Sequence, residues 1–247
     1  MVNAGLMRSS GDRLVNGNKD SFKYVKVLGI IGIAAVFLTM ISDVILLGRP
    51  NSAFSFFAFP TECMADIAQW RITAGVFIGV FMLPFQLAGL VPLYYGLKPL
   101  GRKKQLLVVI PAGHALTMGI AFHMSYSFMA SGWKLSHKAA ELNDLINEGL
   151  VPNMMKDFDF YWKFLIVIMM TELIISSFIF VILVLNGKTL FPKLMAAFNP
   201  LFILGVMIVI ICFIPAPVGG FVAPTILNTS NLTFFIISTA VVHKRTR

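Results

Sequence analysis

The chain has 247 residues, of which 57 % are hydrophobic and 13 % charged, and its mean hydropathy is +0.83. Soluble globular domains are about 45–50 % apolar, so this composition excludes an ordinary soluble domain and predicts a membrane protein. The net charge of +9 would also suit a nucleic-acid-binding protein. No surface of interleaved basic and aromatic residues accompanies that charge, so we expect no nucleic-acid partner.

Six apolar stretches are long enough to cross a bilayer, which takes about 17–25 mostly apolar residues. We place the corresponding helices at residues 24–48, 70–97, 105–131, 161–186, 191–213 and 224–243. This pattern predicts an all-α, six-transmembrane-helix bundle that forms one polytopic membrane domain over residues 24–243. Residues 1–23 are expected to be a flexible cytoplasmic lead segment, and residues 244–247 a cytoplasmic tail.

Basic residues indicate the orientation of the chain in the membrane. Most of the 20 Lys and Arg residues lie before the first stretch, in the second and fourth connections and in the tail, which all fall on one side. Loops rich in Lys and Arg stay in the cytoplasm, so we expect a multi-pass cell-membrane protein with both termini inside. In the connection between helices three and four, on the opposite side, the apolar positions 135, 139, 142 and 146 recur at helical spacing and predict an extracytoplasmic amphipathic helix.

The first two stretches carry small and polar residues on one helical face each. In the first stretch the face consists of Gly29, Gly32, Val36, Thr39 and Asp43, and in the second it consists of Arg71, Gly75, Gly79, Met82, Gln86 and Gly89. Small residues let helix backbones approach closely in a bilayer. We therefore predict that the two helices pack through these faces and that Asp43 forms an ion pair with Arg71. The pair has either a structural role or a role in a substrate site. Gln86 and Asn199 are expected to form interhelical hydrogen bonds.

Three more ionisable residues lie inside the predicted spans. His123 lies at a depth similar to that of Asp43, so the two side chains could meet. His114 precedes His123 by nine residues, so on an ideal helix the two histidines face opposite sides. Glu172 lies near the middle of the fourth span, at the depth of His114. An ionised carboxylate there costs about 2.5–3.5 kcal/mol on insertion scales, which the apolar residues of the span outweigh. Glu172 is thus either a satisfied core contact or a residue that handles a proton or a small molecule.

The sequence holds no complete catalytic, phosphate-binding or metal-binding motif. We expect no metal and no cofactor, although Asp43, His123 and a third ligand would be the starting point of an intramembrane metallohydrolase. Asn228 and Asn231 fit the glycosylation pattern, but they lie at the membrane edge and we discount them. Cys63 and Cys212 fall on the non-cytoplasmic side, and spacing alone leaves open whether they are free thiols or a disulfide.

Four local signatures occur in order along the chain: residues 42–46 (SDVIL), 92–99 (PLYYGLKP), 191–200 (FPKLMAAFNP) and 215–220 (PAPVGG). Together they resemble a family of uncharacterised bacterial polytopic integral-membrane proteins, a domain of unknown function. The resemblance covers most of the chain from Tyr24 onward and implies a multi-helix bacterial inner-membrane protein without a known activity. A family of seven-helix intramembrane zinc hydrolases, the ceramidase and receptor-like group, is not matched, because its paired His-x-x-x-His is missing.

Three classes of function remain open from the sequence. The protein could handle a small molecule or a proton through Glu172 and His114, serve as a structural or partner-binding membrane protein, or act on lipid as a membrane-embedded enzyme through Asp43 and His123. The bilayer is the predicted partner, a small-molecule ligand is a possible second, and the sequence specifies no protein partner.

Overall fold

The structure, a computed structural model, describes residues 4–54, 62–141, 150–187 and 189–245. Over these residues the chain is all-helical and contains no strand, as predicted. Five segments are long and apolar enough to cross a membrane, judged by length and composition, and they are Tyr24–Leu47, Gln69–Gly96, Arg102–Lys138, Val151–Leu185 and Val218–Arg245. The described part of the chain therefore supports a helical membrane protein.

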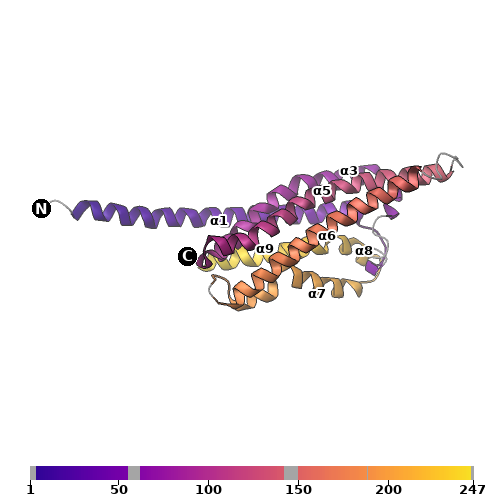
Figure 1. Ribbon diagram of the computed structural model, residues 1–247. Helices are drawn as coiled ribbons and strands as arrows, with labels where there is room; N and C mark the ends of the chain where they lie inside the picture. Colours follow the sequence, from indigo (N-terminus) through magenta and orange to yellow (C-terminus); the bar gives the residue numbers. More distant parts are fainter. Residues whose placement is uncertain (1–3, 55–61, 142–149, 188, 246–247) are drawn as a thin grey trace.

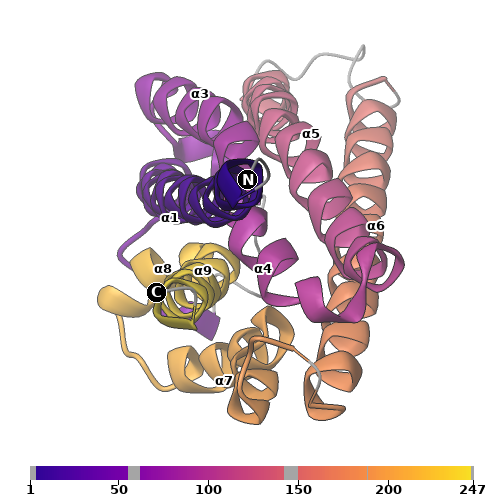
Figure 2. The ribbon, with the colours of Figure 1, turned by 90° about the vertical axis from the view of Figure 1, so that its left-hand side faces the viewer.

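The first four spans are long helices that pair along their lengths. They are α1 (Ala4–Leu47), α3 (Gln69–Gln86) with its continuation through the 3₁₀ turn η2 (Leu87–Gly89) into α4 (Leu90–Gly96), α5 (Arg102–Glu141) and α6 (Leu150–Leu185). Helix α1 lies between α3 and the last helix, whereas α5 packs mainly on α6 (Figures 1 and 2). The packing of the first two spans against each other agrees with the two small-residue faces in the sequence.

The last part of the chain is more broken than predicted. A 3₁₀ segment, η5 (Lys193–Phe198), is followed by α7 (Pro200–Cys212), α8 (Val218–Val222), the turn η6 (Ala223–Thr225) and α9 (Ile226–Arg245). Helix α7 has 13 residues and is therefore about 20 Å long, which is short of a hydrocarbon core of about 30 Å. The predicted span at 191–213 is not confirmed as one crossing helix, because Asn199 and Pro200 end one segment and begin another.

Two other predicted segments differ in extent. Helix α5 continues to Glu141, so Leu135 belongs to it and not to a separate amphipathic helix, while Leu142 and Ile146 lie outside the described residues. The backbone of α1 is helical from Ala4, which covers most of the predicted lead segment. The flexibility of that segment and the domain boundaries stay predictions.

The two ends of the membrane domain meet at one end of the bundle. Val25 at the start of the first span and Val242 at the end of α9 belong to the same buried cluster. Gly29 of α1 lies against Thr239 of α9, and Figure 1 shows the C-terminal end of α9 beside the middle of α1. At the other end, Arg49 N donates to Gly220 O (3.2 Å) and joins the segment after α1 to α8.

Glycine allows a close contact between helix backbones in the bundle. A Cβ atom on Gly32 of α1 would overlap the backbone of Gly89 in η2, so the two chains touch there through backbone atoms. Close backbone approach through small residues is the usual way in which helices associate in a bilayer, where burial of apolar surface gives little driving force. Further along the same interface, Thr39 of α1 contacts Gln86 at the end of α3.

Candidate functional site

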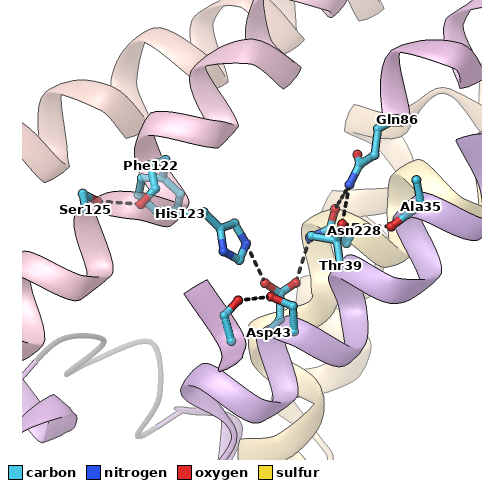
Figure 3. A network of polar contacts seen from close by, with 10 residues as sticks. Ala35, Thr39, Asp43, Gln86, Phe122, His123, Ser125 and Asn228 are labelled. Carbon is cyan, nitrogen blue, oxygen red and sulfur yellow. Dashed lines mark hydrogen bonds and ion pairs between the residues drawn. The ribbon is translucent and has the colours of Figure 1, made fainter. Parts of the chain in front are cut away.

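Asp43 is the centre of a polar network inside the bundle. Its side chain is only 7 % exposed, and each carboxylate oxygen has a partner from a different helix (Figure 3). His123 of α5 places Nε2 3.1 Å from Oδ1, and Asn228 of α9 donates Nδ2–H to Oδ2 at 2.8 Å. Three helices distant in sequence are thereby joined through one carboxylate.

Gln86, at the C-terminal end of α3, extends this network. Its Nε2 donates to Thr39 Oγ1 at 2.8 Å and to Asn228 Oδ1 at 3.4 Å, and Thr39 Oγ1 in turn donates to Ala35 O at 2.9 Å (Figure 3). Two buried atoms of the network, Gln86 Oε1 and His123 Nδ1, have no hydrogen-bond partner within the described residues. An unpaired buried acceptor costs about 1–3 kcal/mol, so these two atoms are places where a bound molecule would gain a contact.

The position of the His123 ring depends on its neighbours. A Cβ atom on Gly79 of α3 would overlap the imidazole, so only glycine leaves the ring its place there. On the other side, the ring of Tyr126 lies edge-on to His123 with 6.1 Å between centroids, and Trp162 of α6 packs on Tyr126 at 6.2 Å. The imidazole is therefore confined by Gly79 of α3 and by Tyr126 of its own helix, and Tyr126 is in turn held by Trp162 of α6.

A cavity of about 330 Å³ runs through the middle of the bundle beside this network. Its walls come from α1, α3, α4, α5, α6, the first residue of α7 and the η6–α9 segment, and most of its lining is apolar. The polar lining residues include Asp43, Gln86, His123 and Asn228 of the network, Asn231 of α9, and Ser176 and Ser177 of α6. Ligand sites in proteins are commonly cavities of about 300–1,000 Å³ with apolar walls and a few polar groups, so this cavity has the form of a binding site.

The predicted ion pair between Asp43 and Arg71 is wrong. Arg71 instead uses its guanidinium to bind backbone carbonyls at the C-terminal end of α1, donating Nε–H to Ile45 O at 2.8 Å and Nη2–H to Gly48 O at 2.5 Å. Carbonyls in the last turn of a helix lack intrahelical donors and carry partial negative charge, so a cation is favoured there. Arg71 therefore caps α1, and Asp43 is left to His123 and Asn228.

Arg49 lies close to Arg71, just beyond the first span. Burial lowers the pKa of Arg49, the positive charge of Arg71 lowers it further, and Asp66 partly offsets both effects. The cause is the ordinary one, since desolvation and a like charge both disfavour the charged form. This end of the bundle thus concentrates positive charge around the end of α1.

His114 and Glu172 form a second histidine–carboxylate contact, between Nδ1 and Oε1, on α5 and α6. The side chains are 52 % and 21 % exposed, so this pair lies at the outer surface of the helices and does not line the central cavity. Glu172 Oε2 is buried and has no hydrogen-bond partner within the described residues. Ser176, one turn further along α6, donates to Val108 O at 2.9 Å.

The residues predicted to pack helices contact several different partners. Gly75 lies against Leu46 of α1, Gly79 against His123 of α5, and Gly89 against Phe235 of α9. Gln86 forms its predicted interhelical hydrogen bond. Asn199 does not, because its Oδ1 accepts from Phe202 N at 3.0 Å and caps α7, while its Nδ2 donates to Ala196 O.

Sequence reasoning overlooked Asn228, Tyr126 and Trp162. Asn228 was set aside as part of a glycosylation pattern, although Asn228 and Asn231 fall on one face of the last span at a spacing of three residues, which is a signal for an inward polar face. Tyr126 and Trp162 carry no comparable signal, because aromatic residues are common at membrane interfaces. Their role becomes visible only when α5 and α6 are placed side by side.

Two further chemical features bear on the site. No group of three or more His, Cys, Asp or Glu side chains stands close enough to hold a metal ion in the described part of the chain. Cys212, at the end of α7, is a free and exposed thiol, and the side chain of Cys63 lies outside the described residues.

The chain belongs to the DUF6796 family of unknown function, whose model matches residues 16–245. This confirms the predicted membership of a domain-of-unknown-function family. No curated protein and no solved structure matches the chain.

Proposed function

We propose that this protein binds one elongated amphiphile in the central cavity, with the head group at the Asp43–His123–Asn228 network. The observation that carries the proposal is the cavity itself, which is about 330 Å³ in volume, apolar along most of its walls and lined by the residues of the Asp43–His123–Asn228 network. In a helical membrane protein, buried polar residues around an internal space are first considered as candidates for a functional site.

The length of the cavity suits an extended hydrocarbon chain. Lining residues recur along α5 from Val108 to Phe122 and along α6 from Met169 to Phe180. The first of these runs is about 21 Å long at the helical rise of 1.5 Å per residue. A linear chain of about 16 carbons is therefore a suitable probe.

The head group is best described as a hydrogen-bond donor. Both oxygens of Asp43 are already occupied, by His123 and Asn228, whereas Gln86 Oε1 is buried without a donor among the described residues. A hydroxyl or an amine that reaches Gln86 would supply the missing donor. A carboxylate head would bring a second negative charge toward Asp43, which is unfavourable where the dielectric constant is low.

The experiment uses Trp162, which lines the cavity, as a fluorescent reporter. Trp70 and Trp133 are replaced by Phe, and the protein in lipid nanodiscs is titrated with a bromine-labelled 16-carbon alcohol. We expect saturable quenching that unlabelled hexadecanol and hexadecylamine reverse more effectively than hexadecanoate or hexadecane. Quenching that rises linearly with the probe and that all four compounds reverse equally would indicate simple partition into the bilayer and overturn the proposal.

Matched variants on α5 separate the cavity from the outer surface. Leu116→Phe narrows the cavity and should abolish saturable quenching, whereas Leu107→Phe changes a residue that is 57 % exposed and does not line the cavity, and should leave it intact. Gln86→Leu should weaken binding of the alcohol and leave binding of hexadecane unchanged. Equal behaviour of Leu116→Phe and Leu107→Phe would count against binding in the cavity.

A second candidate function is proton handling by His114 and Glu172. It is favoured by their direct contact and by the buried, unpartnered Oε2 of Glu172. Ionisable pairs within the bilayer commonly mark proton relays. Proteoliposomes with an internal pH-sensitive dye should show proton flux that is lost in Glu172→Gln and kept in Asp159→Asn, a change at an exposed carboxylate of the same helix. Equal flux in wild type and Glu172→Gln would overturn this candidate.

The remaining proposals concern enzyme activity and location. A lipid-acting enzyme that uses Asp43 and His123 is less well supported, because His123 Nδ1 has no hydroxyl or thiol partner in the described part of the chain. A structural or partner-binding role is the outcome if no probe binds. From the resemblance seen in the sequence we propose a bacterial inner membrane, and from the Lys and Arg pattern we propose that both termini lie in the cytoplasm.

A further inference from the structure

An apolar groove lies between α6 and α7 on the outer surface of the bundle. Its exposed rim includes Phe178, Phe202 and Val209, which are 67 %, 56 % and 61 % exposed. The residues that line this groove are Ile174, Ser177, Phe178, Val181, Asn199, Leu201, Phe202, Gly205, Val206, Val209 and Ile210. Because α6 is a membrane span and the lining is almost entirely apolar, the groove faces the hydrocarbon of the bilayer.

The groove exists because α7 does not pack closely on α6. Helix α7 contacts α9 more extensively than α6, and Figure 2 shows it beside the lower part of α6. A Cβ atom added at Gly205 would meet no other atom within 4 Å. Glycine here is not needed for close helix packing, in contrast to Gly32 or Gly79, and its effect is to leave space beside α6.

Only a thin wall separates this groove from the central cavity. Ser177 lines both spaces. On either side of it along α6, Ser176 lines the cavity and Phe178 lines the groove, and at the start of α7 Pro200 lines the cavity and Leu201 the groove. The two spaces therefore adjoin at Ser177 and at the first turn of α7.

We propose that the α6–α7 groove is a lateral entrance through which the hydrocarbon chain of a single-chain amphiphile passes from the bilayer into the central cavity. This inference rests on the proposed function of the cavity. The occupant follows from the surroundings, since a groove open to bilayer hydrocarbon is filled by alkyl chains and not by water or a charged solute. Of its polar side chains, Asn199 is already occupied as the cap of α7, which leaves Ser177 at the junction.

The test compares the association and dissociation rates of the ligand with its equilibrium dissociation constant. A lateral entrance sets how fast the chain enters and leaves, and blocking it slows both steps without changing the affinity of the cavity. In the Trp162 reporter protein, Gly205→Phe fills the groove, and Gly205 itself does not line the cavity. Stopped-flow mixing with the bromine-labelled alcohol should show association and dissociation slowed by about tenfold, with Kd changed by less than about twofold, as for a gated site.

Ile208→Phe is the matched control, because Ile208 is 40 % exposed on the same helix and does not line the groove. It should bind at wild-type rates. Gly205→Leu provides a smaller block if Gly205→Phe does not fold, and should give an intermediate rate. Wild-type rates in both Gly205 variants, with binding intact, would overturn the entrance and leave the cavity proposal standing. Absence of saturable binding in the wild-type reporter would instead overturn the cavity proposal.

Discussion

Two histidine–carboxylate contacts in the described part of the chain differ mainly in how they are enclosed. Asp43 and His123 are each 7 % exposed and are surrounded by side chains from α1, α3, α5, α6 and α9. Glu172 and His114 are 21 % and 52 % exposed and connect only α5 with α6. The same two chemical groups thus occupy the inside of the bundle in one case and its outer surface in the other.

Enclosure decides what each contact contributes. A buried group that loses its partner cannot find another, so breaking an enclosed pair is costly, whereas a partly exposed pair can rearrange toward neighbouring side chains. We therefore expect the inner pair to hold the helices together and the outer pair to contribute little to stability. The outer pair is accordingly better suited than the inner one to change its protonation without disturbing the fold.

The largest effect is expected for Asp43→Leu. It removes the acceptor of both His123 and Asn228 and should lower the free energy of unfolding by about 3 kcal/mol, the lower part of the range for a buried pair that loses one member. Unfolding in SDS mixed micelles measures the change. Asp43→Asn retains one acceptor oxygen and should be affected less. A loss below about 0.6 kcal/mol, an average bilayer hydrogen bond, would show that enclosure does not strengthen the inner pair.

A smaller effect is expected for Gly79→Ala, which leaves both members of the inner pair in place. The new methyl group would overlap the His123 ring, and overpacking of this kind costs about 1–3 kcal/mol. Gly119→Ala on α5 is the control, because its Cβ would meet only the two methyl groups of Leu83, at 3.3 and 3.7 Å. Thermal unfolding should show a clearly lower Tm for Gly79→Ala alone. An equal drop in Tm in both variants would mean that the ring is not held by this contact.

The smallest effect is expected for the outer pair. Replacing His114 and Glu172 together by Leu should change the free energy of unfolding by less than about 1 kcal/mol in either direction, because apolar replacement of both members leaves no unpaired charge. The same SDS titration reports it. A loss as large as that of Asp43→Leu would remove the distinction between the two pairs.

The sequence predicted the helical membrane fold and the meeting of Asp43 with His123, because depth along a span can be counted from the residues. It did not predict the partner of Arg71. Charge suggested Asp43, but the last carbonyls of α1 are equally good acceptors for a guanidinium and lie closer to Arg71. Local hydrogen-bond chemistry of this kind depends on rotation of α3 about its axis, which periodicity alone does not fix.

The last part of the chain was harder for a related reason. Residues 191–213 are apolar throughout much of their length, so hydropathy predicts a span, whereas the break at Asn199 and Pro200 is a capping signal that outweighs it. The central cavity could not be predicted either. It depends on how α5 and α6 lie relative to α9, and no single residue determines that arrangement.

The shortness of α7 also has a consequence for how the protein is made. A helix of 13 residues is too short to be retained by a bilayer as an independent segment. During insertion, α7 therefore reaches a stable position only when it can pack on α9, the helix that it mainly contacts. The segment on one side of the proposed entrance is consequently fixed only after α9 has been made.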